Sequence, residues 1–223
     1  MDGETCFDSE VDGPLTMTGQ VGNAEIFAKM QRDIGQIFLE FSALGHFQLL
    51  GITGAQLLEN AKAPHILNPA LKPEMQKIMG AKDMATSTRI DVLADVLSQL
   101  PIHAVPDGME NAVKRMEAAD GDIRLAELLA ELGLAERQFR TEFKRIIGLT
   151  PKAFCKTLQI NRALNHLLTS TKGDLASVAI ETGFSDQAHF TRAFSKFLGK
   201  APKGYLVDVE KTLSRFVGQS RPG

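Results

Sequence analysis

The sequence predicts a mostly α-helical protein, α+β overall, in which a seven-helix domain with two helix-turn-helix units covers residues 107–223. Three observations lead to this prediction. Helical periodicity, interrupted by glycine and proline, fills the second half of the chain. That half also contains an internal repeat. Alternation at period two, which is typical of strands, is confined to the first 52 residues. We therefore expect a loose N-terminus over 1–14, a small α+β domain over 15–106 and the helical domain after it.

The expected strands lie between residues 15 and 52. The segment LTMTGQV, residues 15–21, alternates apolar and polar side chains. The segment QIFLEFSAL places Ile37, Leu39 and Phe41 on one face of an extended chain. The sequence therefore predicts a few strands here, followed by a helical tail.

The helical tail is predicted over 54–61, 71–79 and 84–100. Its last helix carries an apolar stripe at helical spacing, made by Ile90, Leu93, Ala94, Leu97 and Leu100. Such a stripe either covers the domain's own core or joins two copies of the chain, and both readings stay open. The segment PIHAVPDG, residues 101–108, contains two prolines and a glycine, and we place the domain boundary there.

Every further element is predicted to be helical. The periodic segments are 109–119, 124–131, 136–147, 151–168, 174–182, 186–198 and 202–213. Glycines follow most of these segments, as is typical at the ends of helices. Pro151 and Pro202 stand in the first turns of predicted helices. Proline is tolerated there because the backbone N–H that it lacks would have no hydrogen-bond partner within the helix.

The internal repeat has an offset of 51 residues. Its pattern is F-x3-F-x4-G-x2-P-x2-aromatic, and the paired positions are Phe139 and Phe190, Phe143 and Phe194, Gly148 and Gly199, Pro151 and Pro202, Phe154 and Tyr205. A short helix and a glycine precede each copy. Two helices joined by a tight glycine turn are the helix-turn-helix pattern, whose second helix usually enters the DNA major groove.

The faces of the two second helices support this interpretation. Their phenylalanines recur at helical spacing and predict buried faces. The outward positions form the candidate DNA-binding set: Arg137, Arg140, Thr141 and Lys144 in the first helix, and Gln187, Ala188, Thr191 and Arg192 in the second. An arginine or a glutamine side chain can form two hydrogen bonds with the edge of one base, and threonine or alanine can pack on a thymine methyl group. The alternative is two ordinary amphipathic surface helices.

The helix between the two units has a suitable length. At 1.5 Å per residue, the segment 151–168 would be roughly 27 Å long. With the turns at its ends it could separate two recognition helices by about 34 Å, one turn of B-DNA. One chain could then contact two adjacent major-groove segments.

At this point the residues resemble a known family. The segments GDIRLAELLAELGLAERQFRTEFKRIIGLTPKAF and LASVAIETGFSDQAHFTRAFSKFLGKAPKGYL look like the DNA-binding domain of the AraC/XylS regulators. The resemblance covers residues 107–206. It implies two helix-turn-helix units and a bacterial transcription regulator, and it places all the candidate residues except Lys144 toward bases. Residues 14–100 resemble, less strongly, the cupin-like effector half of some members, here without its opening strands.

The two units differ at matching places. The first unit has Ala135 where the family usually has a serine or threonine helix cap, and Leu129 where a small alanine is usual. The second unit has Ala179 at the tight contact, and we expect Ser185 to be its cap. Loss of a cap costs about 1 kcal/mol. The first unit also carries more positive charge on its outer face, so we expect it to bind mainly phosphates and the second unit to discriminate bases.

Composition excludes several other classes of protein. The chain has 223 residues and two cysteines, Cys6 and Cys155, too few for a disulfide framework or a four-cysteine zinc site. No hydrophobic run approaches the length of a membrane span, and the acidic N-terminus does not resemble a secretory signal. Residues 1–106 hold 7 basic and 13 acidic side chains, a net charge of −6, and residues 107–223 hold 18 and 14, a net charge of +4.

No enzyme is predicted. The sequence lacks the usual nucleophile, metalloprotease and phosphate-loop motifs, and its five histidines have no ligand spacing, so we expect no catalytic residue, metal or cofactor. Double-stranded DNA is the expected partner, in a bacterial cytoplasm and away from membranes. RNA polymerase, a small-molecule effector and a second copy of the chain are left open as further partners, as is the choice between activator and repressor. The alternative function is a protein-protein interaction module without effective DNA binding.

Overall fold

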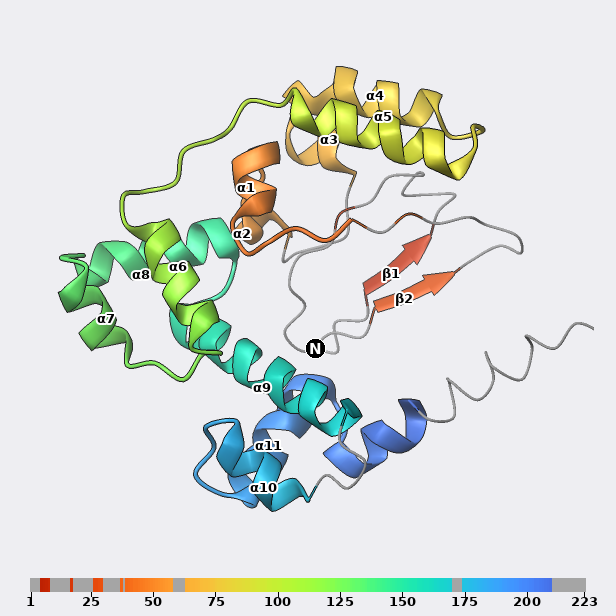
Figure 1. Ribbon diagram of the computed structural model, residues 1–223. Helices are drawn as coiled ribbons and strands as arrows, with labels where there is room; N and C mark the ends of the chain where they lie inside the picture. Colours follow the sequence, from red (N-terminus) through yellow and green to blue (C-terminus); the bar gives the residue numbers. More distant parts are fainter. Residues whose placement is uncertain are drawn as a thin grey trace, which may run out of the picture. The chain divides into compact units, whose positions relative to one another are not determined.

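A computed structural model describes residues 5–8, 17, 26–29, 37, 39–57, 63–169 and 174–209. The chain divides into two compact units. The first comprises Met1–Arg115 and Arg124–Ala153, and the second comprises Met116–Ile123 and Phe154–Gly223. Helices dominate both units (Figure 1).

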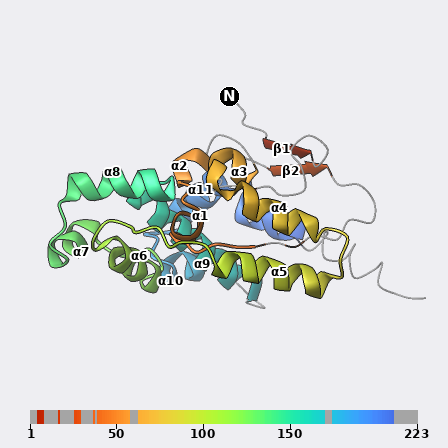
Figure 2. The same ribbon diagram turned by 90° about the horizontal axis from the view of Figure 1, so that it is seen from above.

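The N-terminal part of the first unit is a set of short helices around a small apolar core. They are α1 (Gly45–Leu50), α2 (Gly54–Leu57), α3 (Pro64–Leu67), the 3-10 turn η1 (Pro69–Leu71), α4 (Lys72–Gly80) and α5 (Thr86–Ser98). The core is formed by Leu50, Ile52, Leu57, Leu71, Met75 and Leu100. The helices α4 and α5 lie side by side (Figure 2). Part of the predicted stripe on α5 stays outside this core, because Ile90 is 49% exposed.

The α+β domain predicted over 15–106 is not confirmed. Ile37, Leu39 and Phe41 do not form a strand, and the residues described between 39 and 106 form helices and turns. The reason is local: the Gly45 amide donates to the Ser42 carbonyl and to its hydroxyl, which turns the chain directly into α1. Phe41 packs against the helical core instead of a sheet. Of the other predicted strand, over 15–21, all residues but Met17 lie outside the described residues.

The strands that are described lie elsewhere. β1 (Thr5–Asp8) and β2 (Ile26–Lys29) pair in parallel, with Thr5 opposite Ile26. β1 falls within the N-terminus that was predicted to be loose, so that prediction is wrong for these four residues.

The rest of the first unit contains the first helix-turn-helix. Its helices are α6 (Met109–Ala118), which continues into the second unit, α7 (Leu125–Glu131) and α8 (Glu136–Ile147). The face of α8 that contains Phe139, Phe143, Ile146 and Ile147 is buried, as the spacing predicts. An ion pair of 2.7 Å joins Arg115 on α6 to Glu131 on α7.

The second unit contains most of α9 (Pro151–Thr169), together with α10 (Leu175–Glu181), α11 (Gln187–Leu198) and a further helix over 202–209. Its core is made by side chains of all these helices: Ile160, Ala163, Leu167, Leu175, Val178, Ala179, Phe184, Phe190 and Phe194 are buried, and Tyr205 packs against them. The loop after α6 approaches α9 closely at Gly121, where a Cβ atom would lie 2.1 Å from the Cys155 carbonyl oxygen.

The helices predicted beyond residue 108 are therefore confirmed, to within about two residues at their described ends. The predicted helix over 202–213 is described as far as residue 209. Within the described part of the chain, every helix is too short or too polar to span a bilayer.

Candidate nucleic-acid interface

The two helix-turn-helix units close their turns with the same backbone hydrogen bond. In the first, the Leu134 amide donates to the Leu129 carbonyl at 2.9 Å. In the second, the Phe184 amide donates to the Ala179 carbonyl, also at 2.9 Å. A glycine with positive φ precedes each donor, Gly133 at 66° and Gly183 at 81°. This left-handed conformation favours glycine, and it explains why both turns contain one at this place.

Leu129 and Ala179 occupy equivalent buried positions in these turns. Leu129 is 2% exposed and Ala179 is fully buried. The first unit therefore accommodates a larger side chain at the contact between its two helices. A well-packed interior is sensitive to such a change in volume.

The outer face of α8 presents the predicted polar side chains to solvent. Arg137, Arg140, Thr141 and Lys144 are all exposed. The Arg140 guanidinium is held by Glu136, one turn earlier, at 2.6 Å. The Thr141 hydroxyl donates to the Arg137 carbonyl at 3.0 Å. Exposed pairs of this kind contribute less than about 1 kcal/mol, so an incoming phosphate can replace Glu136 as the partner of Arg140.

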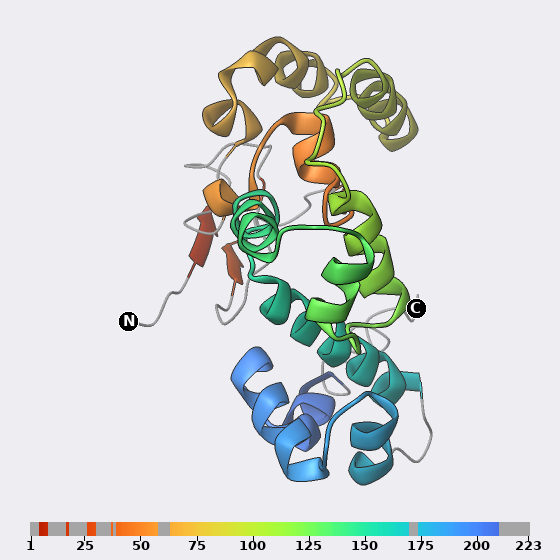
Figure 3. The ribbon, with the colours of Figure 1, turned by 90° about the vertical axis from the view of Figure 1, so that its left-hand side faces the viewer.

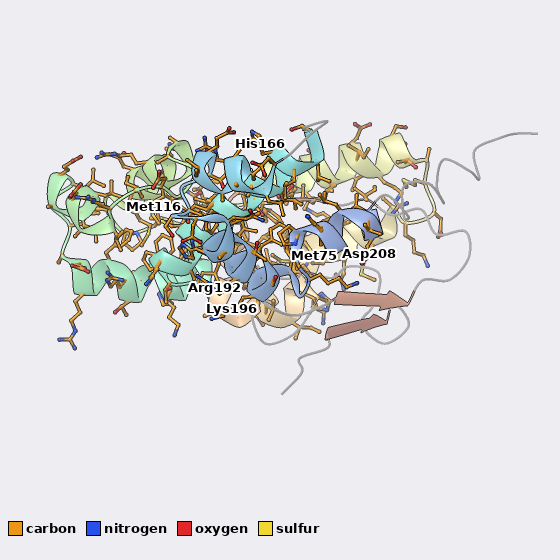
Figure 4. All side chains as sticks on the ribbon, turned by 90° about the horizontal axis from the view of Figure 1, so that it is seen from below. Met75, Met116, His166, Arg192, Lys196 and Asp208 are labelled. Atoms are coloured by element: carbon orange, nitrogen blue, oxygen red, sulfur yellow. The ribbon has the colours of Figure 1, made fainter. Side chains whose placement is uncertain are left out.

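The outer face of α11 is less charged. Gln187, Ala188 and Arg192 are exposed, and Thr191 is half-buried. Arg192 and Lys196 follow each other one turn apart on this helix (Figure 4). Lys196 is also exposed, and it was not among the candidate DNA-binding residues predicted from the sequence. The repeat could have found it, because Arg145 stands 51 residues earlier.

The cap of α11 is Asp186, so the expectation for Ser185 is wrong. The Asp186 carboxylate accepts from the His189 amide at 2.7 Å. This hydrogen bond is the main cause that holds the pKa of Asp186 below its ordinary value. The Ser185 hydroxyl lies beside the cap, 3.1 Å from the carboxylate and 3.1 Å from His189 Nδ1.

The repeat offset explains the difference. The first helices of the units, α7 and α10, are 50 residues apart, whereas α8 and α11 are 51 residues apart. The second turn is thus one residue longer, and Ala135 corresponds to Asp186. No side chain caps α8 at Ala135, as the sequence predicts.

His189 takes part in local packing on α11. Its ring contacts the Phe184 ring edge-on, with 5.4 Å between the centroids. Among the described residues, histidine, cysteine and acidic side chains form no group of three that could hold a metal ion.

Comparison with known proteins identifies the domain that contains these helices. A helix-turn-helix domain family matches residues 128–207. An uncharacterised HTH-type transcriptional regulator of Staphylococcus aureus is 32% identical over 87 residues, which are 39% of this chain and 12% of the relative. The probable transcriptional regulator LumQ of Photobacterium leiognathi is 34% identical over 83 residues, 37% of this chain and 33% of the relative.

One of the similar solved structures covers about half of the chain. It is a transcriptional regulator from Chromobacterium violaceum with an AraC-type DNA-binding domain. It is 24% identical and covers 52% of this chain and 94% of its own, with a TM-score of 0.40. The chain spans a third or less of the length of the two relatives above. Residues 128–207 are therefore similar to the helix-turn-helix domain of bacterial transcriptional regulators.

Proposed function

We propose that the protein is a sequence-specific DNA-binding transcription regulator of the bacterial cytoplasm, which contacts two adjacent major-groove segments through α8 and α11. The observation that supports this most is the matched construction of the two helices. Each buries its phenylalanines and exposes a polar face at positions 51 residues apart. Bacterial transcriptional regulators share this part of the chain.

The two helices differ in the chemistry that they expose, and we assign them different roles. The exposed cations Arg137, Arg140 and Lys144 on α8 suit phosphate contacts, which hold a protein on DNA without reading its sequence. Gln187 and Arg192 on α11 can form paired hydrogen bonds with adenine and guanine. Thr141, Ala188 and Thr191 are small enough to pack on thymine methyl groups.

We assign residues 15–106 a regulatory or dimerising role. The 49% exposed Ile90 on α5 is compatible with contact to a second copy of the chain. RNA polymerase and a small-molecule effector are further candidate partners.

Selection of binding sites from random DNA, followed by affinity measurements at several salt concentrations, tests the proposal. Because phosphate contacts release counterions, affinity for the selected site should fall steeply as salt rises. It should exceed affinity for random DNA by about 10³-fold or more. A protein that acts only as an interaction module would select no sequence and show no salt-dependent complex.

A matched pair of variants shows whether the proposed surface is used. Arg137→Ala removes an exposed cation from α8, and Lys77→Ala removes an exposed cation from α4. The first should weaken binding and the second should leave it unchanged. Equal effects would mean that DNA does not contact the outer face of α8.

A further inference from the structure

The last turn of α8 is held by a side chain from a distant part of the sequence. A helix leaves its final carbonyl groups without partners inside the helix. Here the Gly148 amide satisfies the Lys144 carbonyl at 2.9 Å. The Ile146 carbonyl lies 2.9 Å from Nε2 of His46, which is 100 residues earlier in the chain. Because a carbonyl only accepts, the imidazole must donate from Nε2. His46 is 9% exposed, so this hydrogen bond is shielded from water.

The same turn is in backbone contact with the start of α2. A Cβ atom on Gly54 would lie 2.2 Å from the carbonyl carbon and oxygen of Ile147, and 2.5 Å from the Gly148 nitrogen. A Cβ atom on Gly148, whose φ is +89°, would lie 2.8 Å from Gly54. Side chains do not fit between the two segments. Gly54 therefore allows α2 to lie directly against the end of α8 (Figure 3).

A third contact is made by α1. The guanidinium carbon of Arg145 lies 5.5 Å from the centre of the Phe47 ring. Arg145 also pairs with Glu142 at 2.8 Å, so its side chain stays close to the helix. The helix α1 is itself anchored, because the His103 amide donates to the Gln48 carbonyl at 2.7 Å.

These contacts lie at the end of α8 opposite to its first turns. Arg137 is exposed near the start of the helix, and residue 146 lies roughly 13 Å further along the axis. DNA and residues 45–57 can therefore contact α8 at the same time. The start of α8 has no side-chain cap at Ala135. The stability of the helix therefore depends more on the contacts at its other end.

We propose that residues 45–57 are a positioning segment for the first recognition helix, in which His46 and Gly54 set the orientation of α8 and thereby the fit of its outward side chains to DNA. The consequence for DNA rests on the function proposed above. The support of α8 rests on the contacts alone. The two parts can therefore be tested separately.

Hydrogen exchange in the free, full-length protein tests the support. Gly54→Ala must displace α2, and the amides of the last turns of α8 should then exchange faster than in the wild type. Gly80→Ala is the matched control, because a Cβ atom there meets nothing within 4 Å. His46→Leu removes the donor to Ile146 and should also accelerate exchange. His46→Gln keeps an N–H donor and should restore part of the protection.

DNA affinity, together with a footprint of each half of the site, tests the consequence. On the site selected by the wild type, Gly54→Ala and His46→Leu should lose roughly 2- to 30-fold in affinity, the range over which distant residues modulate coupling. The change should be confined to the half of the site that α8 contacts, whereas a general loss of stability would affect both halves.

The outcomes separate the two ideas. Unchanged exchange in α8 for both Gly54→Ala and His46→Leu would overturn the positioning role. Equal loss at both halves of the site would overturn its consequence for DNA. If exchange changes as expected but the wild type selects no DNA, the support of α8 stands and the proposed function is refuted.

Discussion

The helix α8 has no side-chain cap at Ala135, and adding a single hydroxyl oxygen at this position should provide one. Ala135 has φ −70° and ψ 112°, an extended conformation that suits a capping residue. Asp186, the corresponding residue of the second unit, accepts a hydrogen bond from the amide three residues later. A hydroxyl at position 135 could accept in the same way from the Gln138 amide. We therefore predict that Ala135→Ser stabilises the start of α8.

The expected gain is about 1 kcal/mol, within a range of about 0.5–2 kcal/mol for such caps. One kcal/mol corresponds to a factor of about 5 in the local opening equilibrium. Amides in the first turns of α8 that exchange by local opening should therefore exchange about 5-fold more slowly. If the unit unfolds cooperatively, its melting temperature should rise by about 2–4 °C.

Ala85→Ser is the matched control. Ala85 stands before α5 in the same unit, in an extended conformation with φ −56° and ψ 148°, and has no side-chain cap. Its replacement should protect α5 and leave exchange in α8 unchanged. The reasoning is refuted if Ala135→Ser leaves exchange in α8 at the wild-type rate, or if both variants protect α8 equally.

Four further predictions concern DNA and pH. Arg192→Ala should cost about 1–3 kcal/mol on the selected site and much less on random DNA, measured by fluorescence anisotropy. Arg140→Ala should weaken all sites similarly and reduce the salt slope by about one unit. Gln187→Ala should relax preference at one or two base positions in a panel of single-base changes. Burial lowers the pKa of His46 below its ordinary 6.5. Since the unfolded chain binds the proton more readily, stability should fall as pH drops below about 6.5, and His46→Gln should flatten this dependence in thermal melts.

The helices of the second half could be predicted because their signals are local. Phenylalanines at helical spacing define the buried faces, and glycines end the helices at left-handed positions such as Gly148 and Gly199. The repeat also locates the two outward faces. The prediction failed at the cap because Ala135 was matched to Ser185 at the 50-residue offset of the first helices, whereas the second helices are 51 residues apart. The extra residue in the second turn moves the cap from Ser185 to Asp186.

In the N-terminal part, the helices predicted over 71–79 and 84–100 correspond to α4 and α5, but the segments before them could not be predicted in the same way. Period-two alternation over only a few residues, as at Ile37, Leu39 and Phe41, does not distinguish a strand from an irregular segment beside a core. The helices α1 and α3 contain six and four residues, too few to show a helical period. The contact of Gly54 with Ile147 joins residues 93 positions apart, and no local pattern reports it.

The packing of α1 and α2 on α8 limits how freely this domain could be exchanged between proteins. A chain that begins at residue 107 would keep every residue of both helix-turn-helix units, yet it would lose the donor to the Ile146 carbonyl and the backbone that covers Ile147. The Ile146 carbonyl and the backbone of Ile147 would then face water or another molecule. Fusion to a foreign N-terminal domain would have the same effect unless that domain supplied a donor and a glycine at matching places. Separating the two segments would therefore expose the end of the first recognition helix.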